Sequence, residues 1–255
     1  MRTTLALTLM IVVIPAHAVG SFSAGYGYTD YSRGYGNKKI SYAEMNQKLD
    51  KGALVLNAAS GKRVYSNESY SGTRARGTLY YNWNPTLSTR SGLSWSTHSP
   101  VFVRREVFND FNFKLIKRTV FTVGGRHASY YGDNRVNSWS AGGALYLGAA
   151  IATYRYTHYA SSDSGNSYSH LLSLRVKDSA GQGYTQLWLG RGTARYAYDW
   201  RPDSQSGKMH SVSLKRFQPL TKDIALTLVA GRQWYNTPLR DYQGTFVEGG
   251  MIFQW

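Results

Sequence analysis

The sequence lacks cysteine altogether, so the fold has no disulfide bond, and neither a thiol nucleophile nor a thiolate metal site is available. Hydrogen bonding and burial must therefore hold the chain together. Acidic residues are also scarce: 14 Asp and Glu stand against 30 Lys and Arg, which gives a net charge of +16 at pH 7. Such an excess favours an anionic partner, namely nucleic acid, an anionic membrane surface or an anionic cargo.

Long apolar runs are absent after residue 18, so no transmembrane helix is expected in the mature chain. Before it, a basic start, a short apolar run and the sequence Ala16-His17-Ala18 together predict a secretory signal peptide. We expect cleavage after Ala18, with Ala16 and Ala18 forming the cleavage site, and export by the general secretory route. Residues 1–18 are then the signal peptide and 19–255 form one domain. An exported protein rarely meets nucleic acid, so no nucleic-acid partner is predicted.

The mature chain is rich in Tyr, Gly and Trp and alternates repeatedly between apolar and polar residues, which is typical of β-strands. The alternating segments predict strands of about nine to twelve residues, the length that a tilted strand needs to cross a bilayer. The clearest segments are residues 21–28, 78–83, 87–96, 101–115, 138–147, 168–177, 224–230 and 247–255.

Alternation alone fits a soluble sandwich as well as a membrane barrel, but three features favour the barrel. Tyr and Trp lie near the strand ends, as in aromatic girdles. Short connections, such as residues 84–86, alternate with longer polar ones, such as 65–72, 161–167 and 193–207. The last strand places Met251, Phe253 and Trp255 on one face, a pattern that resembles the C-terminal signal read by the outer-membrane assembly machinery.

The sequence therefore predicts an all-β fold, a transmembrane antiparallel β-barrel of about fourteen strands in the outer membrane of a Gram-negative bacterium. An even strand number keeps both termini in the periplasm. Residues 40–49 and 54–64 alternate poorly, so twelve strands is the alternative.

Several stretches of the mature chain resemble the YaiO family of outer-membrane β-barrel proteins. They are Ser99-Pro100-Val101-Phe102, residues 154–163, Gly183 to Leu189, Tyr198-Asp199-Trp200, Ser211 to Leu214 and Gln218 to Thr221. The resemblance implies an outer-membrane barrel. It implies no defined activity and no set of active residues.

Strand parity places a group of basic side chains on the lumen face, since a charge facing lipid at mid-membrane costs about 2–4 kcal/mol. The same parity places Glu106, Asp110 and Glu248 there. The basic group is Arg74, Arg76, Arg90, Arg104, Arg126, Arg155, Arg175 and Lys215.

Two functions follow from this basic lumen. Unpaired Arg and Lys around a water-filled pore favour anions, which predicts a small passive or polysaccharide-associated, porin-like pore that passes anionic saccharides. Alternatively, the bases pair with acids and close a purely structural barrel.

Further basic residues near the predicted outer loops match the phosphates of lipopolysaccharide, an expected partner together with outer-membrane lipid. These residues are Arg33, Lys38, Lys39, Lys62, Arg63, Arg135, Arg191, Arg195 and Arg240.

A surface lipid-modifying enzyme is the remaining alternative. His158 and His170 flank a serine-rich segment, and His127 lies at another strand end, but no G-x-S-x-G motif is present. Acyl transfer would require His158, His170 and one serine to converge within hydrogen-bond distance. We predict no enzymatic activity, no cofactor and no metal site.

Overall fold

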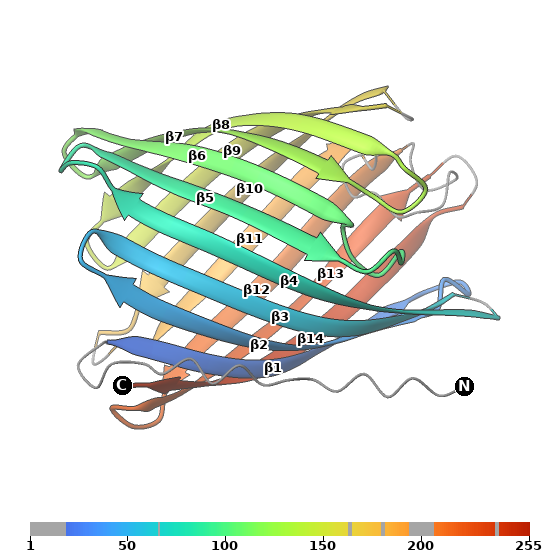
Figure 1. Ribbon diagram of the computed structural model, residues 1–255, viewed down its shortest axis with the longest axis horizontal. Helices are drawn as coiled ribbons and strands as arrows, with labels where there is room; N and C mark the ends of the chain where they lie inside the picture. Colours follow the sequence, from blue (N-terminus) through green and yellow to red (C-terminus); the bar gives the residue numbers. More distant parts are fainter. Residues whose placement is uncertain (1–18, 66, 163–164, 180–181, 194–206, 238–239) are drawn as a thin grey trace.

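The computed structural model describes every residue except 1–18, 66, 163–164, 180–181, 194–206 and 238–239, so the predicted signal peptide with Ala16 and Ala18 lies outside the described residues. The described part is a closed antiparallel barrel of fourteen strands, each slanted against the barrel axis (Figure 1). The strands are β1 (Gly20–Tyr31), β2 (Asn37–Leu49), β3 (Gly52–Tyr65), β4 (Glu68–Asn82), β5 (Leu87–Ser96), β6 (Arg105–Ile116), β7 (Thr119–Ser129), β8 (Arg135–Leu147), β9 (Ala150–Ser161), β10 (Gly165–Lys177), β11 (Tyr184–Thr193), β12 (Lys208–Pro219), β13 (Ile224–Asn236) and β14 (Tyr242–Gln254).

The barrel closes where its first strand pairs with its last. β1 and β14 pair from Ser21↔Gln254 to Tyr31↔Gly244, and the backbone N–H of Gly20 donates to the carbonyl of Trp255 at 3.1 Å. Gly20 and Trp255 therefore lie at the same end of the barrel, which we call the terminal end. We call the opposite end of the barrel the loop end. Among the fourteen described strands, closure leaves no edge unpaired, as a barrel in lipid requires.

The fourteen-strand prediction is confirmed and the twelve-strand alternative is wrong. The two poorly alternating segments form full strands, β2 and β3, which pair with each other from Asn37↔Val64 to Leu49↔Gly52. Backbone hydrogen bonds define these strands, whereas alternation reports only side-chain polarity, and small residues such as Ala43 and Ala58 blur it.

One face of the wall carries large apolar side chains that are exposed on the outside. Leu93, Leu172 and Leu228 are among them, at 65%, 47% and 55% exposure. Tryptophans flank this apolar band: Trp83 lies near the terminal end, and Trp139 lies near the loop end. The pattern is that of a lipid-facing surface with aromatic girdles. No helix in the described part of the chain is long and apolar enough to cross a membrane.

The strands extend further toward the loop end than the hydropathy pattern predicts. The expected connection at 65–72 is shorter, because β3 runs to Tyr65 and β4 starts at Glu68. The expected connection at 161–167 likewise lies between Ser161 and Gly165. Beyond the lipid, both faces of a strand meet water, so hydrogen bonding continues after the apolar alternation has ended.

The connection between β5 and β6, residues 97–104, folds into the barrel, and we call it the inward segment. The predicted strand at 101–115 starts only at Arg105, and Val101 and Phe102 are buried, at 2% and 8% exposure. They pack against Ala59 of β3. The paired glycines Gly61 and Gly72 make room, since a Cβ on Gly61 would lie 2.8 Å from the Val101 side chain.

Candidate functional site

Ion pairs between strands that are not neighbours identify the interior face. Arg155 of β9 contacts Asp110 of β6, Nη2 to Oδ2, at 3.1 Å, although β7 and β8 lie between them in the wall. Arg76 of β4 likewise approaches Glu106 of β6 at 4.0 Å, past β5. These residues alternate with exposed apolar side chains such as Val107 and Tyr154, which lie on the outer face, so the ion pairs line the lumen.

Asp110 receives two guanidinium groups. Besides Arg155, Arg90 of β5 donates from Nη1 to Oδ2 at 3.4 Å, and the Asp110 side chain is only 8% exposed. Gly124, its partner on β7, provides the space, because any Cβ there would collide with the Asp110 carboxylate. One carboxylate is thus shared by two arginines, which leaves one positive charge uncompensated at this point of the wall.

Glu106, four residues before Asp110 on the same face of β6, repeats the arrangement. Arg126 of β7 donates from Nε to Oε1 at 2.9 Å, and Arg76 approaches the same oxygen. The Ser94 hydroxyl donates to Oε2 at 3.3 Å. Arg126 also extends Nη2 to the Tyr130 hydroxyl at 3.4 Å. Again two arginines share one carboxylate.

Phe108 lies between these two acids on β6 and supports the arginines on its ring. The guanidinium carbons of Arg76 and Arg90 lie 5.0 and 4.8 Å from the ring centroid, within cation–π range. Phe108 itself is 7% exposed. In the sequence, this aromatic residue occupies one of the polar, lumen-facing positions of the strand, between Glu106 and Asp110. The prediction of lumen residues was based on charged side chains only and therefore omitted it.

Arg74 connects this cluster to β2 and β3. It donates to Asn57 at 2.9 Å, and Asn57 donates to Glu44 at 3.2 Å, a lumen acid that the sequence analysis missed. Arg74, Arg76 and Arg90 line a groove of about 470 Å³ that also contains Tyr80. The Nε groups of Arg74 and Arg90 are buried without an acceptor among the described residues.

The remaining predicted bases lie apart from this cluster. Arg104 lies just before β6 and pairs with Asp133 of the β7–β8 connection at 2.9 Å, at the loop-end rim. Arg175 of β10 donates to Gln186 at 3.0 Å. Lys215 of β12 is the cross-strand partner of Gln186. Within the described residues, Lys215 makes no ion pair or side-chain hydrogen bond.

Two further bases face the interior, although the sequence analysis assigned them to the outer loops. Arg63 is 4% exposed, and its guanidinium carbon lies 3.9 Å from the Tyr31 ring centroid. Lys38 extends its Nζ to 5.8 Å from the Phe102 ring centroid. Both belong to long strands that continue past the loop-end rim. Extending the alternation of strand faces beyond the lipid region would therefore have placed both residues on the lumen face.

The residues of the enzyme alternative do not converge in the described part of the chain. His158 stacks on Trp139 on the outer face, and His170 shares a 2.7 Å hydrogen bond with the Tyr154 hydroxyl. Ser161, by contrast, donates to Asn134. Asp163 and Ser164 lie outside the described residues. The geometric condition for acyl transfer is therefore not met by the described serines.

The residues predicted to form the assembly signal end the barrel. Met251 and Phe253 are exposed on the outer face of β14, at 40% and 42%, and Trp255 follows at 45%. The indole of Trp255 lies over Gly20, where a Cβ would approach it to 2.9 Å. The segment is thus accessible from outside and also closes the first and last strands.

Comparisons with known proteins agree with this architecture. The family model for the YaiO membrane beta barrel domain matches residues 19–199. A structure titled bacterial polysaccharide outer membrane secretin has a TM-score of 0.61 at 12% identity, covering 94% of this chain and 100% of its own. The CymD monoaromatic hydrocarbon channel has a TM-score of 0.64 at 8% identity, covering 93% and 88%. An anion-selective porin from Comamonas acidovorans has a TM-score of 0.50 at 10% identity, covering 93% and 98%. At such identities the similarity is one of fold, that of porin-like outer-membrane barrels.

Proposed function

Because the chain belongs to the YaiO membrane β-barrel family, we propose that it forms a passive outer-membrane conduit whose basic lumen favours anions, with acidic saccharides as its substrate class. The single observation that carries this proposal is the sharing of each β6 carboxylate, Glu106 and Asp110, between two arginines. Positive charge in excess of the wall acids attracts anions into a water-filled pore and repels cations.

The arginines remain accessible despite their ion pairs. The side chains of Arg76, Arg90 and Arg155 keep 29%, 36% and 34% of their surface exposed. A guanidinium with free N–H groups binds a carboxylate or sulfate in bidentate fashion. Pairing with Glu106 and Asp110 therefore orients these groups and still leaves donors for a passing anion.

The groove beside them supports the choice of saccharides. Arg74, Arg76 and Arg90 lie along it, and Tyr80, 44% exposed, offers a ring face to a sugar. A chain of acidic sugars would bring carboxylates to the arginines and apolar sugar faces to the tyrosine. The fold shared with a polysaccharide secretin and an anion-selective porin is consistent with this use.

A closed structural barrel without transport is the second candidate, and one observation favours it. The inward segment occupies lumen space at the loop end, and the Arg155–Asp110 pair crosses the interior.

Under both candidates the barrel catalyses no reaction. Its termini face the periplasm, to which the signal peptide would deliver the chain. Met251, Phe253 and Trp255 would then be recognised by the outer-membrane assembly machinery.

Single-channel conductance of the refolded mature chain in a planar bilayer under a salt gradient tests the proposal. We expect a stable conductance whose reversal potential favours anions. Arg74→Gln combined with Lys215→Gln should shift that potential toward zero, and Arg126→Glu or Arg155→Glu should shift it further. Lys222→Gln is the matched control, because Lys222 lies in the β12–β13 turn and is 90% exposed. No conductance from protein shown to be folded would reject the pore and favour the closed barrel.

A further inference from the structure

The outer face carries a second concentration of basic groups, unrelated to the lumen. Cross-strand pairing aligns Tyr156, His170, Arg191, His210 and Trp234 in one row over five consecutive strands, β9 to β13. They share parity with the exposed, lipid-facing Leu172 and Leu189. Directly paired side chains lie about 4.5–5.5 Å apart at their Cβ atoms, so this row is continuous.

Three more basic groups flank the row on the same face. Arg232 lies two residues before Trp234 on β13, and Lys208 lies two residues before His210 on β12. His158, on β9, is paired with Trp139 of β8. We call His158, His170, Arg191, Lys208, His210 and Arg232 the outer basic patch.

Aromatic contacts orient the patch without neutralising it. His170 bonds to Tyr154 and lies 5.3 Å from the Tyr156 ring, centroid to centroid. Arg232 lies 5.8 Å from the Trp234 ring centroid. No ion pair among the described residues includes a member of the patch.

Another outer-face arginine shows the contrast. At the terminal end, Arg216 of β12 pairs with Asp178 at 2.6 Å, and this hydrogen bond lowers the pKa of the Asp178 carboxyl. The protein thus supplies a carboxylate where a cation lies on the outer face at one end of the barrel. At the other end Arg232 faces the Trp234 ring instead, and no described carboxylate pairs with Arg191, Lys208 or Arg232, which leaves these cations available to an external anion.

The level of the patch along the barrel axis indicates where such an anion would come from. Trp139 and Trp234 mark the loop-end girdle, where the hydrocarbon gives way to head groups. Basic groups on a lipid-facing wall at this level lie within reach of anionic lipid head groups rather than of solutes in the pore. Phosphate pairs especially well with arginine.

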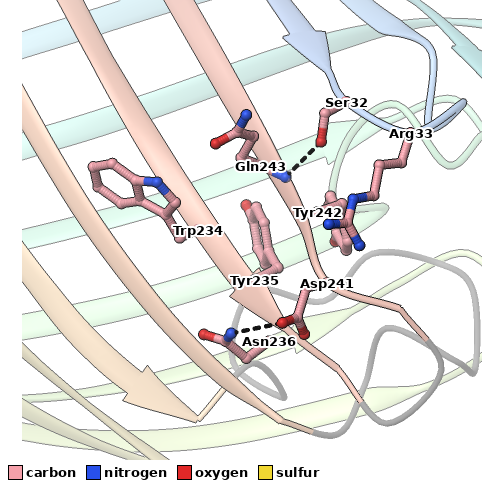
Figure 2. A pocket seen from close by; sticks show the side chains of 8 residues that line it. All are labelled: Ser32, Arg33, Trp234, Tyr235, Asn236, Asp241, Tyr242 and Gln243. Carbon is pink, nitrogen blue, oxygen red and sulfur yellow. Dashed lines mark hydrogen bonds between the residues drawn. The ribbon is translucent and has the colours of Figure 1, made fainter.

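A polar pocket adjoins the row at Trp234. Figure 2 shows Arg33 from the β1–β2 connection on one side of it and Trp234 and Asn236 on the other, around a volume of about 460 Å³. Gln243 lies in the same lining, with its backbone N–H donating to Ser32 at 3.0 Å. Amide groups and an indole face suit a sugar, and Arg33 adds a cation.

The pocket also contains one carboxylate. Asp241 accepts hydrogen bonds from the Asn236 side chain at 3.1 Å and from the Thr237 backbone at 3.2 Å. These bonds hold the Asp241 carboxylate against the end of β13, as Figure 2 shows for Asn236. A sugar hydroxyl could donate to it, whereas a phosphate would bind toward Arg191 and Arg232.

We propose that the outer basic patch and the adjoining pocket bind the phosphorylated disaccharide head group of lipopolysaccharide, with phosphate on the arginines and sugar beside Trp234. An ordinary phospholipid offers a phosphate but no sugar for the pocket. The arginines that would hold the phosphate lie on the outer face of the wall, so the proposal is independent of conduction through the lumen.

Native mass spectrometry of the refolded mature barrel in detergent micelles, titrated with diphosphorylated lipid A, tests the inference. We expect Arg191→Gln combined with Arg232→Gln to weaken binding at least about tenfold, because each charge-assisted contact contributes roughly a factor of ten. Arg105→Gln is the matched control: Arg105 is exposed and starts β6, and it is cross-strand paired with the outer-face Trp95 at the loop end, away from the patch. It should bind like the wild type.

Two outcomes would overturn the proposal. The first is equal binding by the double variant and the wild type, both shown to be folded by their heat-dependent shift on gels. The second is equal binding of dephosphorylated lipid A, which would leave only apolar contact. If the arginine variant fails to fold, His170→Phe combined with His210→Phe replaces it; unchanged binding there would also count against the patch. Single-channel conductance should be the same for all of these variants.

Discussion

Asp110→Asn is the substitution whose effect the structure defines most sharply. The asparagine has nearly the same shape, so it fits over Gly124, where even a Cβ would collide with residue 110. What changes is one negative charge, and with it the link that joins β5, β6 and β9 through Arg90 and Arg155. The lumen gains one net positive charge.

The expected loss of stability follows from the two contacts. A hydrogen bond to a charged group contributes about 1.5–3 kcal/mol when it is well formed and shielded. Arg155 is 3.1 Å from the carboxylate, but Arg90 is 3.4 Å away, close to the longest distance at which a hydrogen bond forms. Both arginine side chains are about one-third exposed, so solvent weakens the pairs. The asparagine oxygen can still accept one bond, and we therefore expect a loss of about 1–2 kcal/mol.

Urea unfolding in lipid vesicles, followed by tryptophan fluorescence, measures this loss. Asp223→Asn is the control: Asp223 is 59% exposed in a turn and faces Lys222 at 3.9 Å, so its removal should change the free energy of unfolding by less than about 0.5 kcal/mol. A double-mutant cycle with Arg155→Gln isolates the pair across the interior. If the two Asn variants are equally stable, or if the cycle shows no coupling, the reasoning is wrong. Asp110→Asn should also increase anion selectivity.

Two other substitutions test separate parts of the barrel. Gly61→Ala places a Cβ 2.8 Å from Val101 and 3.0 Å from Phe102, so it should displace the inward segment and increase the single-channel conductance, whereas Gly77→Ala, whose nearest neighbour would be Leu56 at 3.7 Å, should not. Trp255→Ala removes the exposed terminal aromatic and its contact with Gly20, so a smaller fraction of the protein should reach the outer membrane in a cell-fractionation assay; an unchanged fraction would show that Met251 and Phe253 suffice.

The two faces of the wall could be predicted because lipid and water impose opposite polarity on neighbouring residues of a strand. Leu93 and Leu228 lie outside for that reason, and Arg126 and Arg155 lie inside with Glu106 and Asp110. The rule depends only on parity and on the cost of a charge in lipid, so it needs no knowledge of distant contacts.

The same rule failed where the environment is neither lipid nor open lumen. Val101 and Phe102 have the apolarity of a lipid-facing strand, but they are buried inside, since the glycines at 61 and 72 leave a recess there. Those glycines are far from residue 101 in the sequence. Nothing in the local pattern distinguishes an apolar residue against lipid from one against a recess.

The sequence likewise could not predict which charged side chains pair with each other. Parity placed Arg155 and Asp110 on one face, but their contact depends on how the closed barrel curves β6 and β9 toward each other across two intervening strands. Arg63 shows the complementary case: its parity is that of the lumen, and only its nearness to a loop suggested otherwise.

The distribution of partners between the two faces suggests how one basic chain separates two roles. Inside, arginines share carboxylates in pairs, so Arg90 and Arg155 are fixed in place while a positive charge is kept. Outside at the loop end, Arg232 faces the Trp234 ring, and no described carboxylate forms an ion pair with a member of the outer basic patch. A mobile anion in the lumen must leave again, which partial compensation favours, whereas a lipid anchor gains from full charge. Neutralising Arg191 and Arg232 should therefore change lipid binding but not ion selectivity, and neutralising Asp110 should change ion selectivity but not lipid binding.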